Sequence, residues 1–132
     1  MKIVQASGRH KAAIARATVR DGEGRVYVNG VALEAYQPEI ARLRIQESLM
    51  LVPELTKKVD IHVRVSGGGF MGQANAARTA IARALADWSG SEEVREKFRG
   101  YDWSMIKSDV RRKEPKKPGG PGARAKYQKS YR

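Results

Sequence analysis

The residues from 63 to 78, VRVSGGGFMGQANAAR, are the first candidate for chemistry. Gly67, Gly69 and Gly72 match G-x-G-x-x-G, the spacing of loops that hold the pyrophosphate of a dinucleotide. A dinucleotide site also needs a second parallel strand that ends in an acidic residue about 20 residues further on. Asp87 lies at that distance, but within a predicted helix, and SEEVREKFRG after it predicts another helix. No Lys-Ser or Lys-Thr pair follows the last glycine, so the loop is not a Walker A motif either.

Two interpretations of this glycine loop stay open. In the first, the glycines let a strand turn sharply into a helix whose alanines pack closely on a sheet. In the second, the missing side chains let a phosphate approach the backbone amides at the start of that helix. The two are compatible, and the positive charge of the chain favours a nucleic-acid phosphate over a nucleotide cofactor. The loop residues predicted to contact RNA are Gly67, Gly68, Gly69 and Gln73.

Residues suited to catalysis or metal binding are few and scattered. His10 lies in a basic turn and His62 on the polar face of a predicted strand, so both are interpreted as hydrated or RNA-facing imidazoles. Glu92 and Glu93 are neighbours at a helix start, where acidic side chains complement the helix dipole. The chain has no cysteine and two histidines, which argues against a zinc site. We therefore predict no catalytic residue, metal, cofactor or small-molecule substrate, and no enzymatic activity.

The charge of the chain is strongly positive and unevenly distributed. Among 132 residues, 26 are Lys or Arg and 14 are Asp or Glu, which gives a net charge of +12. Residues 1–110 carry a net +4, whereas residues 111–132 carry nine basic residues and one acidic residue, a net +8. This excess predicts a polyanionic partner such as nucleic acid. No apolar run reaches the ~20 residues of a membrane span and the N-terminus lacks a signal-peptide core, so we expect an intracellular protein without membrane contact.

Basic side chains gather in the first two predicted strands. Residues 12–20 alternate between small apolar side chains and a second set, which contains Arg16 and Arg20 and no acidic residue. A hydrated sheet face would explain isolated arginines, but their clustering favours contact with RNA. Arg78 and Arg83, in the alanine-rich helix, are open to either interpretation, RNA contact or hydration of that surface. The contacts predicted on the strands are Arg9, His10, Lys11, Arg16 and Arg20.

The end of the chain, RRKEPKKPGGPGARAKYQKSYR, differs in composition from the rest. Its prolines and glycines oppose a packed element, so we predict a tail that is extended or disordered when the protein is alone. Its cations can pair with phosphates, and Tyr127 and Tyr131 can stack on unpaired bases. A solubilising tag or a membrane-surface patch is the weaker alternative, since the latter needs an amphipathic helix. The tail cations predicted to bind RNA are Arg111, Arg112, Lys113, Lys116, Lys117, Arg124 and Lys126.

The elements that position these residues follow from periodicity. Alternating apolar side chains predict four strands, at residues 3–6, 12–20, 25–29 and 59–65. The turn DGEG predicts that the second and third of these form a hairpin, closed off by Asn29-Gly30. Helical spacing predicts three helices, from Pro38 to Pro53, from the glycine loop to Gly90, and from Ser91 to about Arg99. This order predicts an α+β fold in two layers, a small sheet covered by helices, with one globular domain at residues 1–110 and the tail at residues 111–132.

Three stretches of the chain resemble one protein family. GGGFMGQANAARTAIARAL is similar to the signature of the universal S-nine family, the ninth protein of the small ribosomal subunit. SGRHKAAIARATVRDGEGRVYVNG resembles the opening strands of that family, and SDVRRKEPKKPGGPGARAKYQKSYR resembles its C-terminal tail. The resemblance covers essentially the whole chain, and the ending YQKSYR is closer to the archaeal and eukaryotic branches than to the bacterial one.

The resemblance implies a β-β-β-α-β-α sandwich with a small mixed sheet and a left-handed crossover, like the second domain of the S-five protein of the same subunit. It implies that the globular domain binds ribosomal RNA in the head of the small subunit, beside other head proteins of the cytoplasmic ribosome. The end of the tail would contact peptidyl-site tRNA, through Lys129, Ser130, Tyr131 and Arg132. The alternatives are a nucleotide-dependent enzyme that uses the glycine loop and a nucleic-acid chaperone that never joins a particle.

Overall fold

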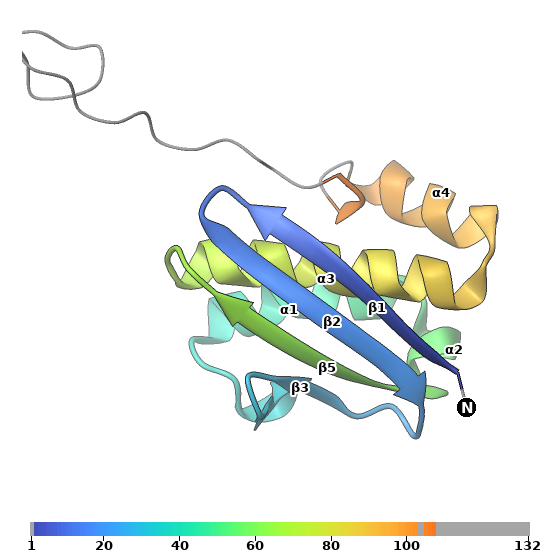
Figure 1. Ribbon diagram of the computed structural model, residues 1–132, viewed down its shortest axis with the longest axis horizontal. Coiled ribbons are helices and arrows are strands. Elements are labelled where there is room, and N and C mark those ends of the chain that lie inside the picture. Colours follow the sequence, from blue (N-terminus) through green and yellow to red (C-terminus); the bar gives the residue numbers. More distant parts are fainter. Residues whose placement is uncertain (1, 103–104, 108–132) are drawn as a thin grey trace, which may run out of the picture.

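Five strands form one mixed sheet in the computed structural model, which describes residues 2–102 and 105–107 (Figure 1). The strand order is β1-β2-β5-β3-β4. The strands are β1 (Ile3–His10), β2 (Ala13–Asp21), β3 (Val26–Val28), β4 (Val31–Ala32) and β5 (Val59–Ser66). All neighbouring strands pair antiparallel except β3 and β5, which are parallel. The predicted α+β class with a small mixed sheet is therefore confirmed.

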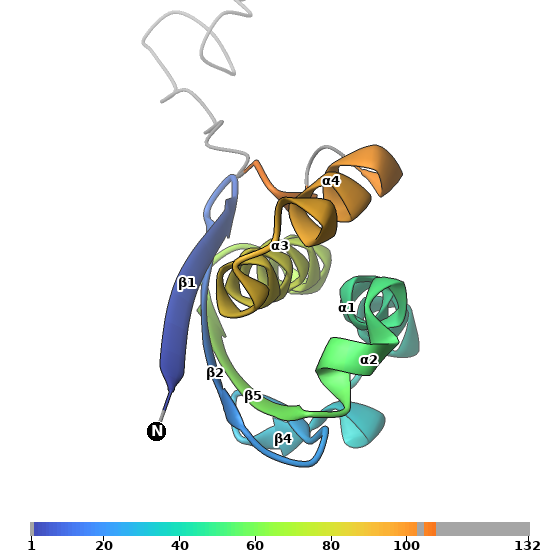
Figure 2. The same ribbon diagram turned by 90° about the vertical axis from the view of Figure 1, so that its right-hand side faces the viewer.

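The helices cover one face of the sheet and leave the other face open (Figure 2). The long helix α3 (Phe70–Ser89) packs against β1 and β2. Two further helices, α1 (Glu39–Leu51) and α4 (Glu92–Tyr101), pack against α3. The short α2 (Pro53–Thr56) follows α1, and a 3-10 turn, η1 (Leu33–Ala35), follows β4. The open face is the surface on which β2 and β5 can present their polar side chains.

Small side chains let α3 lie close to the sheet. Ala13, Ala15 and Ala17 of β2 are fully buried, in alternation with exposed or half-buried neighbours, as the sequence predicts. On β1 a Cβ at Gly8 would lie 2.5 Å from the carbonyl oxygen of Ala76 in α3, so only glycine fits there without a shift of the helix. Because the sheet, α1 and α4 all contact α3, its alanines are buried around most of its circumference.

The predicted hairpin between residues 12–20 and 25–29 is wrong. β5 lies between β2 and β3, and it pairs antiparallel with β2 and parallel with β3. The physical reason is that β1 and β5 pair with β2 along nearly its whole length, which leaves neither edge of β2 for the short β3. The Asn29-Gly30 turn instead joins β3 to β4.

The turn after β2 carries the chain across the end of β5. Asp60 Oδ1 accepts hydrogen bonds from the backbone N–H groups of Arg25 at 3.0 Å and Glu23 at 3.1 Å. These two bonds hold the pKa of Asp60 below its ordinary value of 3.8. The backbone N–H of Ile61 donates to the Arg25 carbonyl at 2.9 Å, so β3 starts on the far side of β5.

The other predicted elements are confirmed in type, with some shifted ends. β1 extends to His10, beyond the predicted residues 3–6, because SGRH pairs residue by residue with β2 although it has no apolar alternation. α1 begins after Pro38, α3 ends before Gly90, and the Ser91 side chain caps α4. The predicted domain boundary at residue 110 and the tail at residues 111–132 lie outside the described residues.

Candidate nucleic-acid interface

The open face of the sheet carries three of the arginines predicted to bind RNA. Side chains along β1 and β2 alternate between the two faces, and the register places Arg9, Arg16 and Arg20 on the open one. Arg16 and Arg20 are exposed, whereas Arg9 is half-buried and its Nε donates to the Lys11 carbonyl at 3.0 Å. Along β2 the positions of Arg16 and Arg20 are about 13 Å apart, so these two side chains lie at separate positions on the open face.

Arg20 has an acidic residue opposite it. The β2–β5 register pairs Arg20 with Asp60, whose carboxylate is ionised at neutral pH and accepts the two backbone hydrogen bonds of the turn, which lower its pKa further. Arg16 is paired in the same register with Arg64, another cation. The positive charge of the open face is therefore concentrated at Arg16 rather than at Arg20.

The remaining two residues of the predicted basic cluster lie elsewhere. His10 ends β1 on the helix-covered side, where its Cδ2 lies 3.7 Å from the position of a Cβ at Gly72. Lys11 is exposed in the turn between β1 and β2, with a φ of 55°. The five predicted residues thus form two groups: three lie on the open face, and His10 and Lys11 lie at the end of the sheet beside the glycine loop.

The glycine loop packs against the β1–β2 turn. Gly67 and Gly68 have φ values of 79° and 64°, which residues with side chains rarely adopt, and a Cβ at Gly67 would meet the carbonyl oxygen of Ala12. Gly69 caps α3 with an ordinary φ of −91°, and nothing lies within 4 Å of a Cβ there. Gln73 Nε2 closes the loop by donating to the Gly67 carbonyl at 3.2 Å. The sharp turn therefore explains Gly67 and Gly68, whereas Gly69 has open space beside it.

The elements after the glycine loop do not make a dinucleotide site. Asp87 lies within α3, where its Oδ1 pairs with Arg95 Nη2 at 3.1 Å, and α4 follows α3. No strand follows α3 in the part of the chain that the structure describes.

Among those same residues, no three His, Asp or Glu side chains gather as metal ligands would. Nor does any helix within them have the length and apolar character needed to span a bilayer.

Two residues of the open face, Arg64 and Tyr27, were not singled out as RNA contacts from the sequence, and His62 was interpreted as either hydrated or RNA-facing. Arg64 of β5 lies directly opposite Arg16. Tyr27 of β3 and His62 of β5 are also opposite each other, with stacked rings whose centroids are 5.0 Å apart at an interplanar angle of 17°. The alternation of residues 59–65 indicates that His62 and Arg64 lie on the polar face of their strand, but only the strand register shows that this face adjoins Arg16.

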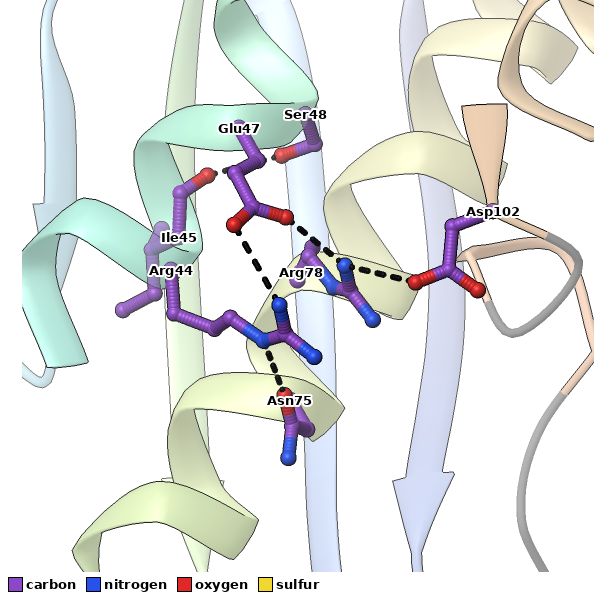
Figure 3. Close-up of polar contacts among 7 residues, drawn as sticks. All are labelled: Arg44, Ile45, Glu47, Ser48, Asn75, Arg78 and Asp102. Carbon is purple, nitrogen blue, oxygen red and sulfur yellow. Dashed lines mark hydrogen bonds and ion pairs between the residues drawn. The ribbon is translucent and has the colours of Figure 1, made fainter. Parts of the chain in front are cut away.

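Arg78, whose role the sequence left open, is buried and structural. Its side chain is 2% exposed, and its Nη1 lies 2.8 Å from Glu47 Oε2 and 3.1 Å from Asp102 Oδ2 (Figure 3). Glu47 Oε1 also pairs with Arg44 Nη1 at 3.3 Å, so this buried network joins α1, α3 and the end of α4. Arg83 Nη1 donates to a backbone carbonyl of β1 at 3.0 Å. Arg78 is therefore neither an RNA contact nor a hydrating surface residue.

A small basic α+β body with arginines on an open sheet face is typical of proteins that bind nucleic acid. The family model described as ribosomal protein S9/S16 matches residues 8–132. The small ribosomal subunit protein uS9 of Methanothrix thermoacetophila is 50% identical over 132 residues, which are 100% of both chains. The chain belongs to the ribosomal protein S9/S16 family, as the resemblance of its three stretches indicated. Members of this family are structural proteins, so the prediction that the protein is not an enzyme is confirmed.

Proposed function

We propose that the chain is a structural constituent of the small subunit of the cytoplasmic ribosome, where it binds folded ribosomal RNA of the head. The observation that carries this proposal is the 50% identity, over the full length of both chains, to a small ribosomal subunit protein. The net charge of +12 supports it, because a protein packed into RNA replaces the counterions of the phosphates. Affinity then comes from counterion release and shape fit, and other proteins of the head are the expected neighbours.

Two groups of residues on the body are the proposed ribosomal RNA contacts. The first group lies on the open face of the sheet and consists of Arg9, Arg16 and Arg20. The second group lies at the end of the sheet, where the β1–β2 turn meets the glycine loop. Its support is the open space at Gly69, which leaves room for a phosphate near the first amides of α3. This second group consists of His10, Lys11, Gly67, Gly68, Gly69 and Gln73.

The tail supplies the remaining proposed contacts. Its support is the charge of residues 111–132, a net +8 in a segment rich in proline and glycine. The tail cations from Arg111 to Lys126 would pair with ribosomal RNA phosphates. The last four residues would contact peptidyl-site tRNA, as the resemblance to the family implies, through Lys129, Ser130, Tyr131 and Arg132.

A left-handed crossover like that of the second domain of the S-five protein is part of the same proposal. The parallel pair β3 and β5 requires a crossover connection, and this connection runs through α1 on the helix-covered face (Figure 2). Such a hand is rare in general, because the twist of strands favours right-handed crossovers. The family resemblance, rather than any local sequence rule, is the reason to expect it here.

The test is sedimentation of the endogenous full-length protein with small ribosomal subunits before and after a wash at high salt. A structural constituent is expected to stay with the subunits, whereas a chaperone that binds RNA from outside is expected to wash off. Complete release at high salt would contradict the structural role.

A second experiment tests the tail separately. Deleting residues 127–132 is expected to leave the protein in the small subunit and to speed the release of tRNA from the peptidyl site. The measurement is the tRNA off-rate from subunits that contain the full-length or the shortened chain. An off-rate that does not change would contradict the role of the tail and leave the structural role standing.

A further inference from the structure

The open face of the sheet is hollowed beside its central arginines. A depression of about 550 Å³ lies over β1, β2 and β5, and Arg16, Thr18, His62 and Arg64 are among the residues that line it. A second depression of about 700 Å³ lies towards the β3–β4 turn and is lined by the same two arginines. Arg16 and Arg64 therefore lie between two hollows of the open face.

The two arginines bring an uncompensated charge to one spot. They are direct cross-strand partners, an arrangement that is unfavourable for like charges in a free sheet. Within residues 2–102 and 105–107, none of the ion pairs involves either of them. Arg20 takes part in none of these ion pairs either, but its cross-strand partner is the carboxylate Asp60 rather than a second cation. A phosphate between two guanidinium groups would remove this repulsion and accept charge-assisted hydrogen bonds from both.

An aromatic platform lies one step along the same strands. His62 precedes Arg64 by two residues on β5, about 7 Å along the strand, and its ring stacks on Tyr27 with centroids 5.0 Å apart. Thr18, which is opposite His62, brings a hydroxyl group to the same place. Stacked rings beside arginines are typical of surfaces that hold unpaired nucleobases. The spacing between the arginine pair and the rings fits the step from a phosphate to a neighbouring base.

We propose that this face binds a single-stranded segment of RNA, with one phosphate between Arg16 and Arg64 and one unpaired base against the Tyr27–His62 pair. This inference rests on the proposed function, which supplies ribosomal RNA as the ligand. A double helix would satisfy the arginines but keep its bases stacked within itself. An acidic protein surface would also satisfy the arginines, and it would leave the two rings without a role.

The test measures the affinity of the full-length protein for small-subunit ribosomal RNA. Removing both cations in Arg16→Gln/Arg64→Gln is expected to weaken binding at least about tenfold and to lower the slope of log K against log salt by about 0.7, the value for one single-strand phosphate. Tyr27→Ala is expected to weaken binding about 5- to 150-fold without changing that slope, because stacking carries no counterions. The matched control is Arg42→Gln/Arg95→Gln, which removes two charges from helices on the other side of the sheet and is expected to bind within about twofold of wild type.

Ultraviolet crosslinking of the unmodified complex provides a measurement that does not depend on the folding of any variant. Nucleotide adducts are expected on Tyr27 or His62 and not on Tyr101, which is 56% exposed in α4. If wild type binds the RNA but the sheet variants match the control, or if neither Tyr27 nor His62 carries an adduct, the inference is overturned and the proposed function stands. If the sheet variants bind RNA normally yet are missing from small subunits, the face docks a protein, which also overturns the inference. If wild type neither binds this RNA nor sediments with small subunits, the proposed function itself fails.

Discussion

Replacing Arg78 with methionine is expected to destabilise the folded protein by about 3 kcal/mol. Removing one partner of a buried ion pair typically costs about 3–5 kcal/mol, because the other charge is left without compensation. Arg78 is 2% exposed, but the carboxylates of Glu47 and Asp102 keep 26% and 32% of their side-chain surface, so water can reach them and the lower end of that range applies. Methionine fills the space of the arginine stem, which keeps any cavity contribution small.

The assay is urea and thermal unfolding of full-length wild-type and variant proteins. For a domain of this size, about 3 kcal/mol corresponds to a fall in Tm of roughly 10–15 °C. The control is Arg95→Met, which breaks the exposed pair between Arg95 Nη2 and Asp87 Oδ1, where the side chains are 38% and 49% exposed. That variant is expected to lose less than about 1 kcal/mol.

A double variant separates the loss of charge pairing from the loss of packing. Adding Glu47→Gln to Arg78→Met is expected to recover part of the stability, because Glu47 then keeps only the partly exposed Arg44 as a charge partner and a neutral amide costs less to bury than a carboxylate. If Arg78→Met loses no more than Arg95→Met, the buried network contributes no more than a surface pair, and the reasoning is refuted.

Three further features can be tested by single substitutions. Because the folded-state pKa of Asp60 lies below its ordinary 3.8, its charge stabilises the native protein above about pH 3.8, and this contribution is lost as the pH falls further. In urea unfolding, Asp60→Asn should therefore have a lower free energy of unfolding than wild type at pH 7, and the difference should shrink in acid. Gly8→Ala should lower the free energy of unfolding by about 1–3 kcal/mol, since its Cβ would lie 2.5 Å from the Ala76 carbonyl oxygen, and a melting temperature equal to wild type would contradict this. Gly67→Ala combines a φ of 79° with a Cβ that would meet the Ala12 carbonyl oxygen, so it should lose about 2–5 kcal/mol by the same thermal assay. Gly69→Ala, at the N-cap of α3 with open space around its Cβ, should lose no more than about 1 kcal/mol and stay folded, so that a weakening of ribosomal RNA binding by this variant reports on phosphate approach, and unchanged binding would remove that role.

Which side chains of a strand are buried could be predicted from the sequence, whereas which strands pair with each other could not. The pleat fixes a period of two, so the alternation in residues 12–20 and 59–65 identifies the buried side chains correctly. Pairing is not local: the DGEG turn favours a hairpin, yet β5, far along the chain, lies between β2 and β3. The juxtaposition of Arg16 and Arg64 depends on that register, and for this reason the sequence did not single out Arg64.

The sequence contains a signal for the burial of Arg78 that helical spacing alone does not reveal. Alanines occur on every side of α3, which is typical of a helix covered all round, and a charged residue inside such a helix must be paired. The partner Glu47 lies 31 residues away, on α1. No spacing rule connects two helices at that separation, so the network itself required the packed structure.

The most direct test of the proposed role is the salt dependence of binding between the full-length chain and small-subunit ribosomal RNA. Each phosphate contact adds ~0.7–0.9 to the slope of log K against log salt. With about six to nine contacts from the nine basic residues of the tail, the slope of the full-length chain is expected to be steeper by roughly 4–8 than that of a chain ending at residue 110. Equal slopes and equal affinities for the two chains over a range of ionic strengths would contradict the proposal that the tail neutralises ribosomal RNA.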